Sequence, residues 1–170
     1  MISVGAAASG LYRKEAGTNQ WQTLTDGMPP SPQARAIAIH PQHPEVVFVG
    51  TQRGVYRSQD GGDGWQRMHL PEGRLVWSLA FQPGTPQVLF LGTEGSDVYR
   101  SDDGGERWQY WSTIVNPDAV AINAHHPEQV YFCTRRGQVF GTHDGGTTWH
   151  GHRLPESAGH VISVACASRA

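Results

Sequence analysis

The sequence lacks any long stretch without a helix-breaking residue. Its 170 residues include 21 glycines and 11 prolines, and the longest segments free of both contain 11 residues (106–116 and 160–170). Because glycine and proline interrupt helices, this distribution excludes a fold built from long helices.

The sequence is also poor in features that direct proteins to membranes or nucleic acids. It contains no apolar run near the roughly 18 residues of a membrane span, and residues 1–10 lack the basic start and apolar core of a secretory signal. A formal net charge of −2 provides no broad positive field for nucleic acid or anionic lipid. We therefore expect one cytoplasmic domain that binds neither nucleic acid nor membrane.

Cysteine is scarce as well. Cys133 and Cys166 are too few and too scattered for a disulfide scaffold or a cysteine-type zinc site. Both fall in alternating apolar segments rather than in exposed basic loops. We expect buried reduced thiols rather than a redox pair.

What the sequence has in abundance is an internal repeat. A box with the pattern Ser/Thr-x-Asp-Gly-Gly-x-x-Trp starts at Ser58, Ser101 and Thr142. Its Asp and Ser/Thr side chains can accept hydrogen bonds from N–H groups of their own turn, its glycines permit a positive φ, and its Trp buries a large apolar face. An active site is needed once, whereas this box recurs, so we predict a structural role. The residues given this role are Ser58, Asp60, Gly62, Trp65, Ser101, Asp103, Gly105, Trp108, Thr142, Asp144, Gly146 and Trp149.

The boxes recur at the spacing of a propeller blade. The tryptophans at 21, 65, 108 and 149 lie 44, 43 and 41 residues apart, the length of a four-stranded blade. Three segments with strand composition precede each box, and the Trp begins a fourth. The predicted strands before the boxes are 37–39, 46–49 and 55–58, then 79–81, 88–91 and 98–101, then 120–122, 130–133 and 139–142.

The two ends of the sequence complement each other. Only two strand-like segments, 2–6 and 11–14, precede Trp21, while a further one, 161–166, follows the last box. We predict an all-β, four-bladed propeller whose C-terminal strand pairs into the N-terminal blade, because closure removes exposed strand edges. The predicted single domain has blades at about 161–170 plus 1–30, 31–72, 73–115 and 116–158. The box of the first blade is degenerate, with Lys14, Ala16 and Thr18 at the Ser, Asp and Gly positions.

These motifs resemble those of the Asp-box, or BNR-repeat, propellers. The runs His40-Pro-x-x-Pro44, Val49-Gly-Thr51 and Gly54-Val-Tyr-Arg-Ser58 are most similar to bacterial WD40/YVTN/BNR-like repeat proteins, which are related to photosystem II assembly factors, sortilin-type receptors and proteins described as glycosyl hydrolases. The family includes enzymes and non-enzymes, so the resemblance implies a fold more strongly than a function. Relatives have rings of six or more blades, so four repeats fit a fragment, a shortened homologue or a chain that completes its ring by self-association.

Charged residues that differ between the copies occupy the loops of one propeller face. Guanidinium groups there could bind a carboxylate, a phosphate or an acidic protein patch. The candidate binding residues are Arg53, Arg74, Arg135 and Arg136. We therefore favour a non-catalytic binding or assembly scaffold that contacts a protein partner through these central-face loops.

An enzyme acting on a glycan is the alternative. Glycoside hydrolysis needs two carboxylates about 5 Å apart for retention or roughly 6.5–9.5 Å apart for inversion. Glu94, Asp97 and Asp118 are the candidates for such a pair. A sialidase would need an Arg-Ile-Pro element, which is absent, and a unique tyrosine, whereas the strand tyrosines recur at equivalent positions. A shortened, inactive relative of a larger propeller is a second alternative.

Neither a metal nor a cofactor is predicted. Several of the nine histidines lie in turns beside proline, and His150 and His152 share one side of a strand without a third ligand. Trp77 and Trp111 could stack on sugars, although packing between blades is the interpretation we favour.

Overall fold

In the part of the chain that the structure describes, the regular structure is entirely β-strand. The computed structural model describes residues 2–6, 10–14, 17–70, 74–95, 97–114, 117–155 and 163–166, with residues 2–6 and 113 described by their backbone alone. Within these ranges no helix is present that is long and apolar enough to cross a membrane. The prediction of an all-β fold is confirmed.

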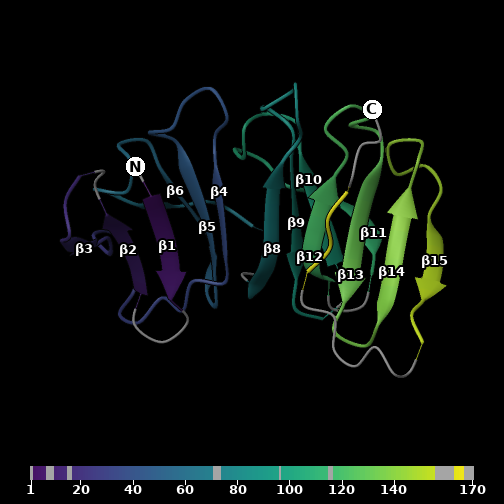
Figure 1. Ribbon diagram of the computed structural model, residues 1–170, viewed down its shortest axis with the longest axis horizontal. Helices are drawn as coiled ribbons and strands as arrows, with labels where there is room; N and C mark the ends of the chain where they lie inside the picture. The colour runs from purple at the N-terminus through teal and green to yellow at the C-terminus, as the bar shows by residue number, and fades with distance from the viewer. Residues whose placement is uncertain are drawn as a thin grey trace.

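The strands form four antiparallel sheets, which we call blades 1 to 4 (Figure 1). Blade 1 contains β1 (Ile2–Ala6), β2 (Gly10–Lys14) and β3 (Trp21–Thr23). Blade 2 contains β4 (Ala36–Ile39), β5 (Val47–Thr51), β6 (Gly54–Ser58) and β7 (Gln66–Arg67). Blade 3 contains β8 (Val76–Phe81), β9 (Leu89–Thr93), β10 (Asp97–Ser101) and β11 (Gln109–Thr113). Blade 4 contains β12 (Pro117–Ile122), β13 (Val130–Thr134), β14 (Gln138–Thr142) and β15 (His150–Arg153).

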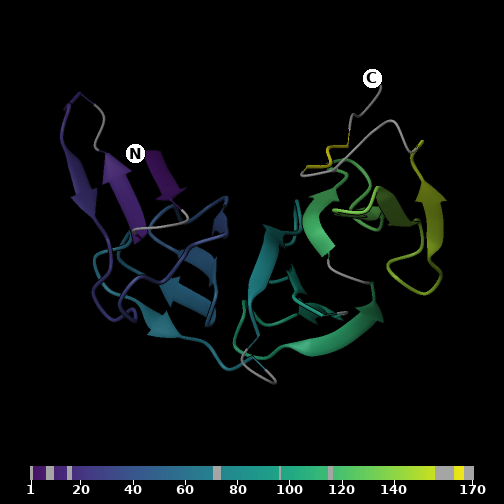
Figure 2. The same ribbon diagram turned by 90° about the horizontal axis from the view of Figure 1, so that it is seen from below.

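The four blades are arranged around an open arc. Figure 2 shows blade 1 and blade 4 at opposite ends of this arc, with the two chain termini far apart. The innermost strands β4, β8 and β12 contact their neighbours in turn. These strands line the concave side of the arc, so residues at their ends are brought together from different blades.

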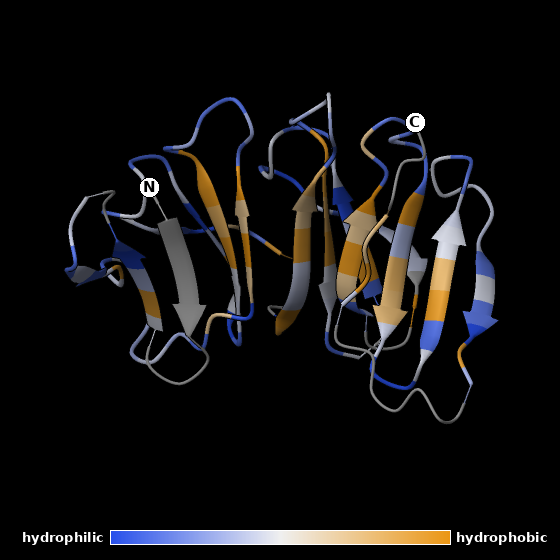
Figure 3. Ribbon diagram, viewed as in Figure 1, coloured by the Kyte–Doolittle hydropathy of each residue, from blue (hydrophilic) through white to orange (hydrophobic). Residues whose placement is uncertain are grey.

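The core lies between the blades rather than inside any one of them. Leu11 of blade 1 packs against Val49 of blade 2, Phe48 of blade 2 packs in a cluster with residues of blade 3, and Phe90 of blade 3 packs in a cluster with Phe132 of blade 4. The second strands of blades 2 and 3, β5 and β9, are therefore buried along their whole length, and Figure 3 shows orange bands of apolar residues on the strands at these interfaces.

Each box forms a hydrogen-bonded turn at the end of the third strand of its blade. In blade 2 the Ser58 hydroxyl donates to the Asp60 carboxylate at 2.7 Å and accepts from the Gly62 amide at 2.7 Å. The Gly64 amide donates to Asp60 at 2.9 Å. Gly62 has a φ of 104°, and a Cβ at this position would lie 2.7 Å from the Leu24 side chain of blade 1. A glycine here therefore serves both the turn and the contact between blades.

These hydrogen bonds favour the charged form of the box carboxylates. Bonds from the Gly64 amide and then the Ser58 hydroxyl lower the pKa of Asp60. Burial would raise the pKa of Asp103, but bonds from the Arg107 amide and the Ser101 hydroxyl outweigh it, so the pKa is lowered. The hydroxyl and amide of Thr148 hold the pKa of Asp144 far below its usual range.

The predicted closure of blade 1 by the C-terminal segment is not found in the described residues. Blade 1 contains three strands there, and Ser163–Cys166 belongs to none of the four sheets. Figures 1 and 2 show this segment beside β13 of blade 4, at the far end of the arc from β1. The segment instead lies against blade 4, where Cys166 is close to Tyr131. Residues 161–162, which belong to the predicted strand, lie outside the described residues.

Candidate binding site on the concave edge

Four side chains from three blades meet at the concave edge of the arc. The guanidinium carbon of Arg135 lies 4.9 Å from the centre of the Trp77 ring, and that of Arg35 lies 5.2 Å from it. Arg135 also donates to Asp118. We call Arg35, Trp77, Asp118 and Arg135 the Trp77 cluster.

The local structure of the innermost strands positions this cluster. Arg35 directly precedes β4, where its amide donates to the Gly50 carbonyl at 2.8 Å. Trp77 lies in β8, where the pairing with β9 shifts register between Val76 and Ser78. Such an irregularity redirects a side chain relative to its neighbours along the strand. Arg135 lies in the turn between β13 and β14.

The cluster carries more positive than negative charge. The Asp118 carboxylate, whose side chain is 8% exposed, accepts a bond of 2.6 Å from the Arg135 amide and one of 3.3 Å from its guanidinium. The Arg135 side chain remains 52% exposed, and Arg35 is exposed as well. Each contact between a guanidinium and an exposed ring contributes only about 0.5–1 kcal/mol. The two arginines are therefore oriented by the indole and keep N–H donors available to a ligand.

The other predicted arginines are not part of this cluster. Arg74 donates to Asp97 within blade 3 at 2.8 Å. Arg53 is exposed in the turn between β5 and β6, and Arg136 is exposed beside Arg135. Of the four candidate binding residues, Arg135 is thus the one that the structure joins to the aromatic ring.

Two of the three candidate catalytic carboxylates bind arginines. Asp97 accepts from Arg74 and Asp118 accepts from Arg135, while Glu94 is exposed in the turn after β9. Both aspartates thus have the geometry of ion pairs with arginines of their own blade. Their catalytic role stays a prediction.

The histidines are spread over the surface. Within the described ranges, no three His, Cys, Asp or Glu side chains are grouped so that they could hold a metal ion. His150 and His152 are exposed on β15. Cys133 is a buried free thiol and Cys166 a half-buried one, and burial raises the pKa of each.

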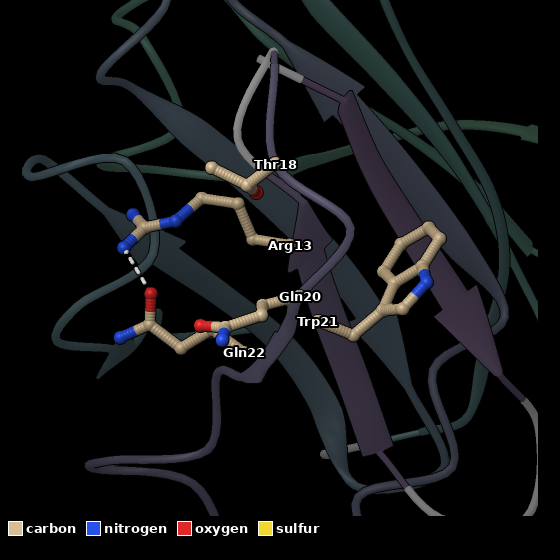
Figure 4. Close-up of a pocket in the computed structure, with 5 residues that line it drawn as sticks. All are labelled: Arg13, Thr18, Gln20, Trp21 and Gln22. Carbon is tan, nitrogen blue, oxygen red and sulfur yellow. Dashed lines mark hydrogen bonds between the residues drawn. The ribbon is translucent and has the colours of Figure 1, made fainter.

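A shallow pocket of about 390 Å³ lies on blade 1 (Figure 4). Its lining residues come from β2, β3 and the turn before β3: Arg13, Thr18, Gln20, Trp21 and Gln22. Arg13 and Gln22 share a hydrogen bond, while Trp21 points away from them (Figure 4). None of the predicted binding or catalytic residues lines this pocket.

Sequence reasoning missed two features. It did not identify Arg35, because a single arginine before a strand has no distinguishing pattern. It also missed ion pairs that join one blade to the box of the next, Arg13 with Asp63 at 2.6 Å and Arg57 with Glu106 at 2.5 Å. The sequence did contain a signal for these ion pairs. An arginine near the end of a strand recurs in successive blades, and the box of the next blade has an acidic residue directly after its Gly-Gly pair.

Comparison with solved structures shows the propeller fold. An ancestral GH74 enzyme matches with a TM-score of 0.78 and 22% identity, over 92% of this chain and 23% of that one. A GH74 enzyme from Niastella koreensis matches with a TM-score of 0.76 and 18% identity, over 91% and 28%. YCF48 bound to a D1 peptide matches with a TM-score of 0.58 and 17% identity, over 69% and 39%. The chain thus spans less than half the length of each of these three proteins.

A family model identifies the chain more directly. No curated protein sequence matches it. The model described as photosynthesis system II assembly factor YCF48 matches residues 13–169, nearly the whole sequence. The resemblance to BNR-type propellers is confirmed, and the chain belongs to the photosystem II assembly factor YCF48 family.

Proposed function

We propose that this chain is a non-catalytic binding propeller that holds a segment of a partner protein against the Trp77 cluster during assembly. The family and the similar YCF48 structure bound to a D1 peptide support a protein partner. The observation that carries the proposal is that the guanidinium groups of Arg35 and Arg135 both contact the indole of Trp77, at the concave edge where three blades meet. Exposed aromatic and arginine side chains are the residues enriched at protein interfaces.

The chemistry of the cluster favours a partner segment that carries a carboxylate. Asp118 neutralises one of the two guanidinium groups, so one positive charge is left for a ligand. An arginine fork binds a carboxylate through two parallel N–H donors, and the half-buried indole offers apolar contact beside it. An acidic side chain or a free C-terminus would satisfy both features.

The proposal is tested by measuring the binding of a labelled peptide with an aromatic residue and a free C-terminal carboxylate. We expect Arg135→Ala and Arg35→Ala each to weaken binding roughly 10-fold or more, since a hydrogen bond to a charged group contributes about 1.5–3 kcal/mol. Amidation of the peptide terminus should have a similar effect. Arg153→Ala, which removes an exposed arginine of β15 outside the cluster, is the matched control. Equal binding by all variants would refute the role of the cluster.

A glycan-active enzyme is the second candidate, favoured by the similarity to GH74 enzymes. Xyloglucan and chromogenic glycosides provide the assay. Sustained turnover that is lost in Asp97→Asn or Asp118→Asn, but retained in Glu106→Gln, would overturn the binding proposal. Absence of turnover together with carboxylate-dependent peptide binding would support it.

A further inference from the structure

The tryptophan that recurs in each blade is buried in the two interior blades and exposed in blade 1. Trp65 and Trp108 are 7% and 6% exposed, because each packs toward the blade that precedes its own. Trp21 occupies the same position in blade 1 but is 53% exposed. Its exposure marks the face on which a preceding blade would pack.

The last blade presents the opposite face of the same interface. By strand register, Phe48, Phe90 and Tyr131 are equivalent, since each lies opposite the alanine of its innermost strand. Phe48 and Phe90 point into the following interface and are 1% exposed, whereas Tyr131 is half-buried. Blade 4 thus ends on a surface that in blades 2 and 3 is covered by a further blade.

Among the described residues, blade 1 has three strands, with none on the inner side of β1. In blades 2, 3 and 4 the strands β4, β8 and β12 pair with β5, β9 and β13. In blade 1, the strand equivalent to β5, β9 and β13 is β1. It pairs with β2 and forms the inner edge of its sheet in the described part of the chain. An open edge of this kind is a template for another strand.

The segment Val164–Cys166 has the sequence of such an innermost strand. The innermost strands contain an apolar residue, an alanine and a second apolar residue at 37–39, 79–81 and 120–122, and Val164-Ala165-Cys166 repeats this pattern. It also has the position of such a strand. β8 contacts β5 of the preceding blade and β12 contacts β9, and Figures 1 and 2 place Ser163–Cys166 beside β13. Burial, and then the proximity of Cys166, raise the pKa of Tyr131.

We propose that two copies of this chain close one ring, in which Val164–Cys166 of each copy adds to β1 of the other as the innermost strand of its blade 1. Blade 4 of one copy then packs on the exposed Trp21 face of its partner. The segment is already on blade 4, where the first strand of a following blade belongs, and β1 of its own chain lies across the open arc (Figure 2). A second copy can supply the β1 edge with which this segment pairs in the proposed ring.

The charges at the ends of the arc fit this arrangement. Between blades 1 and 2 and between blades 2 and 3, a strand arginine pairs with an acid of the next box. At the proposed junction, Gly141 stands at the arginine position and Asn19 at the acid position. Neither residue is charged, so this pair of positions leaves no unpaired charge at the junction.

At one position the proposed junction has a larger residue than the interior interfaces, which have glycine there. A Cβ at Gly50 would lie 2.6 Å from Val76 of blade 3, and one at Gly92 would lie 2.6 Å from Pro117 of blade 4. The equivalent residue in blade 4 is Cys133, whose side chain needs more room. The blades at the junction are therefore set slightly farther apart.

The register of this pairing gives a direct test. Ile39 lies opposite Val47 in blade 2, and the equivalent pair across the junction joins Cys166 to Ile2. In blade 2, the His40 amide donates to the Val46 carbonyl, so the next pair, Ile39 and Val47, is a non-hydrogen-bonded pair. The Cα atoms of such a pair are close enough for a disulfide, and we expect the same of Cys166 and Ile2. We expect Ile2→Cys, mildly oxidised with the native Cys166 present, to form a covalent dimer on a non-reducing gel.

Two variants provide the controls for the crosslink. Ile2→Cys combined with Cys166→Ser removes one partner, and Ser3→Cys places the thiol on the opposite face of β1. Both should stay uncrosslinked. A crosslinked monomer would show that the ring closes within one chain, and the absence of any crosslink would refute the predicted register. Either result overturns the proposal.

Light scattering on the unmodified chain provides the second measurement. We expect a dimer, and we expect Trp21→Ser to raise the dimer dissociation constant at least about 10-fold, as for a buried aromatic residue at an interface. Thermal melting monitored in parallel distinguishes dissociation from unfolding. A monomeric mass at concentrations up to the millimolar range would overturn the proposal.

Discussion

The ion pair between blades 1 and 2 can be tested by removing its arginine. Arg13 donates to the Gly61 carbonyl at 2.8 Å and to the Asp63 carboxylate at 2.6 Å, both in blade 2, and its side chain is 8% exposed. It also donates to Gln22 of its own blade. Arg13→Met removes the charge and these bonds while keeping much of the aliphatic bulk. We expect this substitution to destabilise the folded chain.

The magnitude follows from the burial of the two partners. The loss of Arg13 leaves the buried Gly61 carbonyl without this donor, which costs about 1–3 kcal/mol. Asp63 is 57% exposed, so solvent reduces the ion pair itself to about 0–1 kcal/mol. We therefore expect Arg13→Met to lower the free energy of unfolding by about 2–3 kcal/mol, and Asp63→Asn by about 1 kcal/mol or less.

Urea unfolding followed by tryptophan fluorescence measures these values, and the double variant gives the coupling between the two side chains. Arg57→Met is the matched comparison, because Arg57 pairs with Glu106 across the next interface. Arg100→Met should cost less than Arg57→Met, since Arg100 pairs with Asp102 of its own blade. A loss below about 0.5 kcal/mol for Arg13→Met would refute the proposed contribution of the carbonyl bond.

Two further predictions concern the boxes. Asp103→Ala should lower the free energy of unfolding by about 1–3 kcal/mol, because it removes the hydrogen bonds from the Ser101 hydroxyl and the Arg107 amide, each of which contributes about 0.5–1.5 kcal/mol. Asp102→Ala should cost much less, because Asp102 forms only an exposed ion pair with Arg100. Urea unfolding of both variants tests this, and equal losses would contradict it. Because the folded-state pKa values of Asp60, Asp103 and Asp144 are lowered, their contribution to stability is present above the unfolded pKa and lost as the pH falls through the folded values. The urea midpoint should therefore change little on this account between pH 7 and about 5 and fall below about pH 4, and a midpoint that rises on acidification would contradict this.

The repeating parts of the fold could be predicted from the sequence because each is determined by neighbours along the chain. The box of Ser58 and Asp60 forms its hydrogen bonds within five residues, and its Gly-Gly pair has the positive φ that the turn requires. The alternation in segments such as 37–39 is a local property as well. Strand order and antiparallel pairing follow once three copies are recognised.

The candidate site was less accessible to prediction because its parts are far apart in the sequence. Arg35, Trp77 and Arg135 come from three blades and meet through the arrangement of the innermost strands. Sequence reasoning identified Arg135 as a loop arginine and Trp77 as an aromatic that could stack on a ligand. It did not connect them, because their contact depends on an irregularity in β8 that the residue pattern does not reveal.

Closure of the ring depends on the angle between neighbouring blades, which no single repeat determines. That angle depends on the places where neighbouring blades approach closely, among them Gly50 against Val76 and Gly92 against Pro117. A small error per interface accumulates around the arc, so a count of four repeats does not by itself give a four-membered ring. An open arc with Trp21 exposed at its start is what such an angle gives, and in the proposed dimer the C-terminal segment of one chain completes the first blade of the other.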